Sequence, residues 1–190
     1  MKRLLDTLKN IWKIEDLRNR ILTTLGLLLV YRLGAHVVLP GIDPTKLGLL
    51  TKQTASGVLG LLDMFSGGAF SNASVLALGI MPYISASIVI QLLGIAVPYF
   101  QRLQREGESG RRKINQMTRY LTVIILILQA PAYIANLHAT LPADAFILGG
   151  TLFTVTSVAI LTAGTMFVMW IGEKITDRGI GNGISLIIMI

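Results

Sequence analysis

The sequence predicts an all-α integral membrane protein. Of its 190 residues, 53% are hydrophobic and only 14% are charged, whereas soluble domains carry about 25% charged residues. Four nearly uncharged stretches are each long enough to cross a bilayer, which takes about 20 apolar residues. These predicted spans cover residues 21–39, 72–98, 117–138 and 147–172.

A fifth apolar stretch, residues 184–190, is too short to cross a membrane. We therefore expect residues 1–190 to form one membrane domain with four full spans and the start of a fifth. Because the chain ends inside an apolar stretch, we also expect it to be part of a longer polypeptide.

The positions of Lys and Arg predict how the spans are oriented. Most of the 17 basic residues lie before residue 21, in the loop 99–116 or in the loop 173–183. The other side carries only Lys46 and Lys52. By the positive-inside rule, the N-terminus and both loops are cytoplasmic. The net charge of +7 therefore reflects topology and does not indicate nucleic-acid recognition. The basic cluster of the loop 99–116 consists of Arg105, Arg111, Arg112 and Lys113.

Apolar residues recur at helical spacing before the first span. In residues 1–20, Leu4, Leu8 and Ile11 are separated by charged side chains. This pattern predicts an amphipathic helix on the cytoplasmic face of the membrane. A helix packed on a partner protein would have the same pattern, so both interpretations stay open.

The outer loop after the first span contains an apolar segment, residues 58–65, followed by Ser66, Gly67 and Gly68. The segment is too short to span and too apolar to be simply solvated. One interpretation is a re-entrant half-helix buried in protein at membrane depth. The other is a helix that lies on the outer leaflet.

Three residues interrupt the predicted spans. Pro82 and Pro131 lie within the second and third spans, where a proline can kink a helix. Arg32 is the one charged residue well inside a predicted span. Such residues are by default candidates for a functional role. Because Arg32 lies only about 10 Å from the predicted end of its span, snorkelling or a structural ion pair is the favoured interpretation.

The sequence contains no evident catalytic or metal-binding set. It has no cysteine, and its two histidines, His36 and His138, lie far apart. We therefore expect no enzyme activity, no metal and no cofactor. Residues 179–183 (GIGNG) follow no strand and lack the GKS or GKT ending of a phosphate loop. They predict a tight turn.

Ile80 and Ile84 lie one helical turn apart on either side of Pro82. Their spacing favours packing against lipid or a neighbouring helix. A sharper interpretation is a hydrophobic constriction, in which branched aliphatic side chains exclude ions by dewetting. The residues alone do not decide between the two.

Four motifs resemble the bacterial SecY family, the channel subunit of the Sec protein-translocation complex. They are residues 64–70 (MFSGGAF), 77–87 (ALGIMPYISAS), 106–112 (EGESGRR) and 177–185 (DRGIGNGIS). The motifs occur in the family's order and are spread over most of the chain.

The resemblance implies the first five-helix half of a ten-helix channel built from two inverted halves. Residues 57–70 would be the plug, a short re-entrant helix that closes the resting channel. The second span would form one wall of a lateral gate, with the third span beside it. The implied plug residues are Leu59, Leu62, Asp63, Met64, Phe65, Gly67 and Gly68. The implied pore-ring residues are Ile80, Ile84 and Ile188, and the implied gate residues are Ser85, Ser87, Ile88, Gln91 and Leu92.

The function implied is a passive protein-conducting channel of the bacterial cytoplasmic membrane. Unfolded secretory or membrane proteins with signal peptides would pass across the channel or leave sideways into membrane lipid. The expected partners are the SecE and SecG subunits, the SecA motor ATPase and the ribosome. A secondary transporter with broken helices and a small-molecule site is the alternative. It would draw on the few polar groups in the spans, such as Gln91 and Gln129.

Overall fold

The computed structural model describes residues 14–54, 58–147 and 150–189. Most of the predicted amphipathic helix, residues 1–20, lies outside the described residues. The described part is helical, with two isolated β-bridges and no strand, which confirms the predicted all-α class. The helices are α2 (Glu15–Gly34), α3 (Gly48–Thr54), α4 (Val58–Phe65), α5 (Met81–Ala96), α6 (Pro98–Arg105), α7 (Glu108–Thr140), α8 (Gly150–Arg178) and α9 (Gly183–Met189). Two short 3₁₀ turns, η1 (Pro44–Lys46) and η2 (Ala143–Ala145), lie in the loops.

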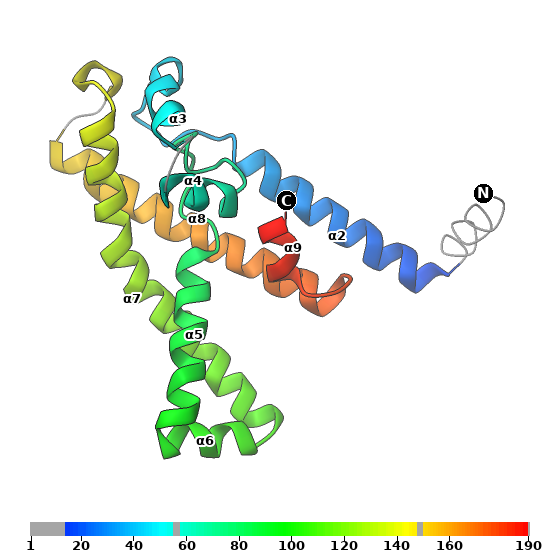
Figure 1. The fold of residues 1–190 in the computed structure, drawn as a ribbon. Coiled ribbons are helices and arrows are strands. Elements are labelled where there is room, and N and C mark those ends of the chain that lie inside the picture. Colours follow the sequence, from blue (N-terminus) through cyan, green and yellow to red (C-terminus); the bar gives the residue numbers. More distant parts are fainter. Residues whose placement is uncertain (1–13, 55–57, 148–149, 190) are drawn as a thin grey trace.

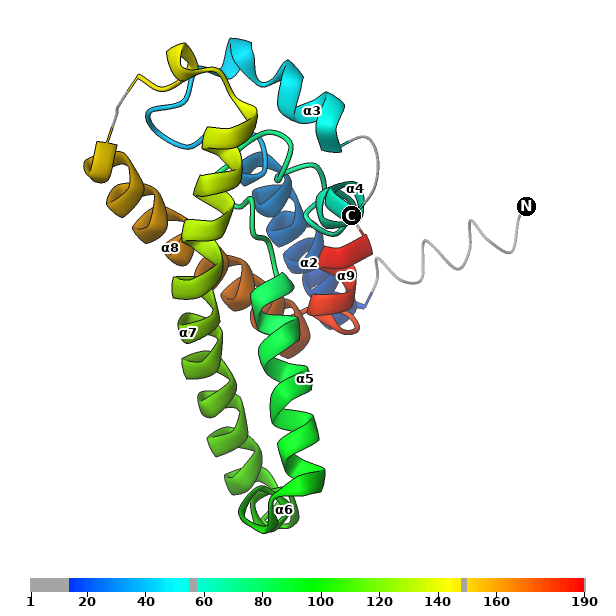
Figure 2. The same ribbon diagram turned by 60° about the vertical axis from the view of Figure 1, so that its left-hand side comes forward.

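The long helices cross one another around α8. Helices α5 and α7 run side by side, whereas α8 crosses behind them and continues toward α2 and α9 (Figures 1 and 2). The short helix α4 lies where these elements meet, close to the end of α9 (Figure 2). Helix α6 caps the far end of the α5–α7 pair (Figure 1).

Among the described residues, α7 and α8 are each long and apolar enough to cross a membrane. Helices α5 and α6 together would make a third span, but they are bent by 100° at their junction. Every 18-residue stretch of α2 contains at least three charged side chains, among them Arg32. The assignment of α2 as a span therefore stays a prediction.

The second predicted span differs from the structure at both ends. Residues 66–80 form a series of turns, and α5 begins only at Met81. Pro82 lies in the first turn of α5, where its missing N–H would have no helical partner, so it does not kink the helix. Pro131, by contrast, lies inside the continuous helix α7.

The predicted cytoplasmic loops are shorter than expected because helix extends into them. Residues 99–116 contain most of α6 and the first turns of α7, joined by a tight turn at Gly107 with a φ of +70°. Proline at the start of α6 breaks the helix after Ala96. Helix α8 likewise continues to Arg178, which leaves residues 179–182 as the turn into α9.

The turn before α9 is docked on α2. The backbone N–H of Ile180 donates to Thr24 Oγ1 at 3.0 Å, and the N–H of Gly183 donates to Thr176 Oγ1 at 2.9 Å. Asn182 Oδ1 accepts from the N–H of Ile184 at 3.0 Å and so caps the first turn of α9. The glycine-rich motif is therefore a tight turn, as predicted, and it joins α2, α8 and α9.

Glycines let α8 approach its neighbours closely. A Cβ at Gly164 would lie 2.1 Å from the carbonyl oxygen of Val75. A Cβ at Gly183 of α9 would lie 2.0 Å from the carbonyl oxygen of Gly172. Side chains at these positions would push the backbones apart, so the crossings depend on glycine.

The loops that follow α2 and α7 are held together by backbone pairing and one ion pair. Residues Val38 and Ser74 form an antiparallel bridge, as do Ile42 and Phe146. Lys46 Nζ also donates to the carboxylate of Asp144 and, at 3.1 Å, to its backbone carbonyl. The Lys46 hydrogen bond holds the pKa of the Asp144 carboxyl below its ordinary value.

Gly164→Ala should destabilise the fold by about 1–3 kcal/mol, the usual effect of adding a methyl group to a close-packed site. Thermal unfolding of the purified protein in detergent measures the effect. Gly26→Ala is the matched control because nothing lies within 4 Å of a Cβ at that position. It should be neutral or stabilise α2 by up to about 1 kcal/mol. Equal unfolding temperatures for the two variants would contradict the close-packing account.

Lys46→Met should raise the pKa of Asp144 toward its ordinary value of 3.8. Because the folded pKa is lowered, the ionised carboxylate stabilises the loop contact above the unfolded pKa. That contribution is lost as the pH falls through the lowered value. The carboxyl ¹³C shift of Asp144, followed by NMR titration, measures the midpoint. A midpoint that does not move in Lys46→Met would show that Lys46 is not the cause.

Candidate functional site

The structure brings the three predicted ring isoleucines into one hydrophobic cluster with α8 and α9. Ile80, the residue before α5, is fully buried, whereas Ile84 and Ile188 are half-buried at the edge of the cluster. Ile80 Cδ1 and Ile187 Cδ1 both pack near Gly172, where a Cβ would lie 3.6 and 3.4 Å from them, in ordinary van der Waals contact. In this state Ile80 is a core residue, and only Ile84 and Ile188 offer accessible surface.

The predicted plug, residues 57–70, divides into two parts with different burial. Residue 57 lies outside the described residues. In α4, Leu61, Met64 and Phe65 are 56%, 76% and 39% exposed. Immediately after the helix, Ser66 is 1% exposed and Ala69 is fully buried. Helix α4 therefore has one exposed face, while Leu59 and Leu62 pack against the larger hydrophobic cluster.

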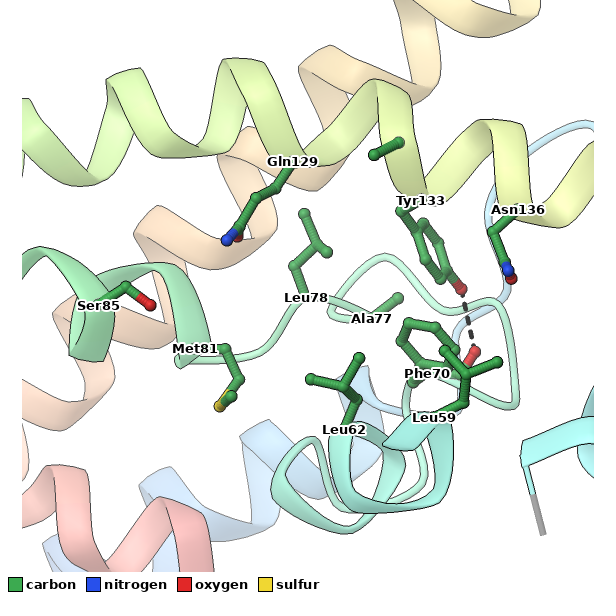
Figure 3. A pocket seen from close by; sticks show the side chains of 11 residues that line it. Leu59, Leu62, Phe70, Ala77, Leu78, Met81, Ser85, Gln129, Tyr133 and Asn136 are labelled. Atoms are coloured by element: carbon green, nitrogen blue, oxygen red, sulfur yellow. Dashed lines mark hydrogen bonds between the residues drawn. The ribbon is translucent and has the colours of Figure 1, made fainter. Parts of the chain in front are cut away.

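Three side chains from two different helices donate hydrogen bonds to the backbone that follows α4. Tyr31 Oη and Arg32 Nη1, both on α2, donate to the carbonyls of Ser66 at 3.0 Å and Gly67 at 2.7 Å. Tyr133 Oη on α7 donates to the carbonyl of Phe70 at 3.0 Å (Figure 3). We call Tyr31, Arg32 and Tyr133 the clamp. Snorkelling or a structural ion pair is the sequence-based expectation for Arg32, and no feature of the sequence indicates the two tyrosines.

Hydrogen bonds from Asp63 of α4 and within the segment also brace the clamped residues. Asp63 Oδ1 accepts from the N–H of Ser71 at 2.8 Å. Ser66 Oγ donates to the carbonyl of Asp63 at 3.0 Å and accepts from the N–H of Phe70 at 3.1 Å. Gly67 and Gly68 adopt positive φ values of 61° and 82°, which glycine allows at little cost. We call residues 66–71 the plug base.

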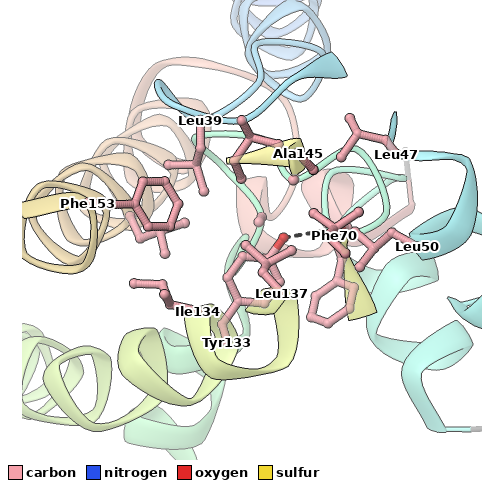
Figure 4. Packing of buried hydrophobic residues seen from close by; sticks show 14 of the residues in the cluster. Leu39, Leu47, Leu50, Phe70, Tyr133, Ile134, Leu137, Ala145 and Phe153 are labelled. Carbon is pink, nitrogen blue, oxygen red and sulfur yellow. Dashed lines mark hydrogen bonds between the residues drawn. The ribbon is translucent and has the colours of Figure 1, made fainter. Parts of the chain in front are cut away.

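The plug base is anchored in the larger hydrophobic cluster. The Phe70 ring packs edge-on against Tyr133 with centroids 4.8 Å apart. Around them lie buried residues of α7, α8 and the loops that follow α2 and α7, including Ile134, Leu137 and Phe153 (Figure 4). Moving the plug base would therefore break both hydrogen bonds and core packing.

A cavity of about 380 Å³ separates α4 from α5 and α7. Leu59 and Leu62 line it from the plug side, and Met81 faces them from the start of α5 (Figure 3). The polar residues in its wall are Ser85, Gln129, Tyr133 and Asn136. Helix α4 thus borders a largely apolar space.

The predicted gate residues lie on two sides of α5. Ile88 and Leu92 are 50% and 59% exposed and form an apolar stripe, whereas Ser85 faces the plug cavity. Gln91 Nε2 donates to Ser87 Oγ at 3.3 Å, and both line a separate cavity of about 400 Å³. The structure therefore places α5 beside α7 but does not gather these residues on one face.

The predicted basic cluster is exposed on the α6–α7 hairpin. Arg112 lies 3.9 Å from Glu108, and Lys113 lies 3.6 Å from Glu106. Arg111 lines the cavity that contains Ser87 and Gln91, and Arg105 is exposed. Exposed pairs of this kind contribute little to stability.

An ion pair that the sequence does not indicate joins two long helices. Arg119 of α7 contacts Glu173 of α8 through Nε–Oε1 and Nη2–Oε2, at 3.1 and 2.5 Å. No group of three or more metal-ligating side chains occurs in the part of the chain that the structure describes.

The fold and site define a helical membrane protein in which a short helix and its irregular base sit among long crossing helices. A model of the SecY family matches residues 74–190, and the chain belongs to that family. The protein translocase subunits SecY of Streptomyces scabiei and Escherichia coli K12 are 46% and 48% identical over 94% and 92% of the chain. The chain spans 43% and 40% of the length of these relatives.

Solved structures show the same fold. A structure described as that of a protein conducting channel matches 90% of this chain and 35% of its own, with a TM-score of 0.55 and 20% identity. Sec61 in the canine ribosome-channel complex from the endoplasmic reticulum matches with the same values.

Proposed function

We propose that this chain forms the N-terminal half of a passive channel for unfolded polypeptides in the bacterial cytoplasmic membrane. Membership of the SecY family supports this proposal, because the curated relatives are named as translocase subunits. The observation that carries it structurally is the contact between the plug base and the start of α5. A Cβ at Gly79 would lie 3.5 Å from Ser66 Cα, so the plug base abuts the residue that precedes Ile80.

In the proposed mechanism, α4 is the plug and Ile84 and Ile188 are this half's accessible share of the pore ring. Aliphatic side chains would seal against ions by dewetting and would not discriminate between passing sequences. Helices α5 and α7 would form one wall of a gate that opens to lipid, where an apolar signal peptide partitions favourably. The basic α6–α7 hairpin would lie on the cytoplasmic side with the N-terminus.

The proposed partners are SecE, SecG and either SecA or a ribosome. The sequence contains no evident nucleotide-binding motif, so the driving energy would come from a partner. The description of the similar Sec61 structure as part of a ribosome-channel complex supports a ribosome partner. We infer no catalytic step in this chain.

Cysteine cross-linking tests the channel directly, because the chain has no cysteine of its own. Ile84→Cys in the complete protein should form a disulfide with a stalled secretory precursor that carries one cysteine. Val89→Cys is the control, since it lies on another side of α5 and is 41% exposed. Cross-linking at both positions, or at neither with a demonstrably stalled precursor, would contradict the ring assignment. Precursor-independent uptake of a small solute would instead favour a secondary transporter.

Ile84→Gly should raise the resting ion conductance of reconstituted vesicles. The increase should be about tenfold for each ~1.4 kcal/mol by which the dewetting barrier falls. Val89→Gly carries the same helix penalty of about 1 kcal/mol on another face and should conduct like the unsubstituted channel. We avoid Ile80 here because it is fully buried, so its truncation would also unpack the core.

A further inference from the structure

We propose that Thr24 of α2 is a positioning residue for the pore ring. Its hydroxyl holds the turn 179–182 against α2 and thereby fixes where α9 begins and where Ile188 stands. The inference rests on the proposed function, since it concerns how the same seal is built. It goes beyond that function because it gives a role in the seal to a residue that lies outside the predicted ring, gate and plug.

The contact between α2 and the turn is close and is made by one buried hydroxyl. Thr24 is 7% exposed. Its Oγ1 donates to the carbonyl of Arg20 at 2.9 Å and accepts from the N–H of Ile180 at 3.0 Å. A Cβ at Gly179 would collide with this Oγ1, so only glycine leaves room for the approach. A second contact, from Arg20 Nη1 to the carbonyl of Gly179, is longer at 3.5 Å.

The turn, the end of α8 and the start of α9 are bonded to one another. The N–H of Gly183 donates to Thr176 Oγ1, which itself donates to the carbonyl of Gly172, both at 2.9 Å. Asn182 Oδ1 accepts from the N–H of Ile184 at 3.0 Å and caps α9. The turn therefore cannot shift without carrying α9 with it. Thr24 is the point at which α2 holds this unit.

Helix α2 also holds the backbone that leads into α5. Tyr31 Oη donates to the carbonyl of Ser66 at 3.0 Å, and Ser66 abuts Gly79, the residue before Ile80. Thr24 and Tyr31 lie seven residues apart, which places them on the same side of the helix and about 10 Å apart along its axis. One continuous helix thus sets the spacing between the backbone before α5 and the turn before α9.

The three predicted ring isoleucines depend on this spacing. Ile80 and Ile84 belong to the start of α5, Ile188 belongs to α9, and all three join one hydrophobic cluster. Apolar packing is non-directional, so it brings these side chains together without fixing how α5 and α9 are aligned. The directional bonds that do so are those from α2. Loss of the Thr24 bond should therefore displace Ile188 relative to Ile84.

Thr24→Val tests the proposal in the complete protein, because it removes the hydroxyl and leaves a side chain of similar shape. The N–H of Ile180 would then face a methyl group and would have to turn toward water, which moves the turn away from α2. Resting ion conductance of reconstituted vesicles should rise about fivefold, the factor that corresponds to one lost hydrogen bond. Thr24→Ser keeps the hydroxyl and should recover most of the seal.

Thr162→Val is the matched control. Its hydroxyl donates to the carbonyl of Val158 at 2.7 Å, within α8 itself, so the same substitution removes no bond between helices there. The resting conductance of Thr162→Val should equal that of the parent channel. Equal conductance in Thr24→Val and Thr162→Val, or no recovery with Thr24→Ser, would refute the proposal.

A distance measurement tests the positioning without relying on channel activity. Spin labels at Asn19→Cys on α2 and Ser185→Cys on α9, both at exposed positions, report the separation of the two helices by pulsed electron–electron double resonance. The complete channel used for labelling carries no other cysteine. The distance distribution should shift or broaden in Thr24→Val and should match that of the parent in Thr162→Val.

The two measurements separate the ways in which the proposal can fail. An unchanged distance distribution in Thr24→Val would overturn the positioning role. A changed distribution with resting conductance at the parent value would overturn the role in the seal. If the parent channel itself neither seals against ions nor transports a secretory precursor, the proposed function fails instead.

Discussion

Irregular backbone inside a helical membrane protein must find hydrogen-bond partners, and this constraint organises the structure. The chain from Ser66 to Ile80 forms turns rather than helix, so its carbonyls cannot be satisfied by the helical pattern. Tyr31 and Arg32 on α2 and Tyr133 on α7 supply donors, and residues 37–39 pair with residues 73–75. Helices α2 and α7 are thus tied to the same short segment, although they are far apart in sequence.

Helix α8 also packs closely against the segment from Ser66 to Ile80. Gly164 lets the Val75 carbonyl approach α8 closely. A larger residue there would push α8 away from the turns and open the backbone carbonyls of the turns to a less protected environment. This contact explains why α8 has a glycine where it meets Val75, at some cost in helix propensity.

The helical class, the two long apolar helices α7 and α8 and the glycine-rich turn before α9 could be predicted from the sequence, because hydropathy and turn residues report local preference directly. Element ends could not, since the prolines at positions 82 and 98 act as helix starters here. The clamp could not be predicted from the sequence either. A tyrosine in an apolar stretch looks like any other aromatic, and its carbonyl partner is defined only after α2 and α7 are placed. Arg32 was correctly singled out as unusual, yet its partner, the Gly67 carbonyl, carries no signal in the sequence.

The three predicted ring isoleucines differ in burial because they occupy different positions in the fold. Ile80 sits at the junction between the turns and α5 and is enclosed by α8 and α9, so its side chain contributes to the fold. Ile84, one turn further along α5, and Ile188 on α9 lie at the edge of the same cluster and retain accessible surface. Under the proposed function, Ile80 would anchor the start of α5 against α8 while Ile84 and Ile188 meet the passing chain. A seal built in this way couples the pore to the plug base, because Ile80 follows directly on Gly79, which packs against Ser66.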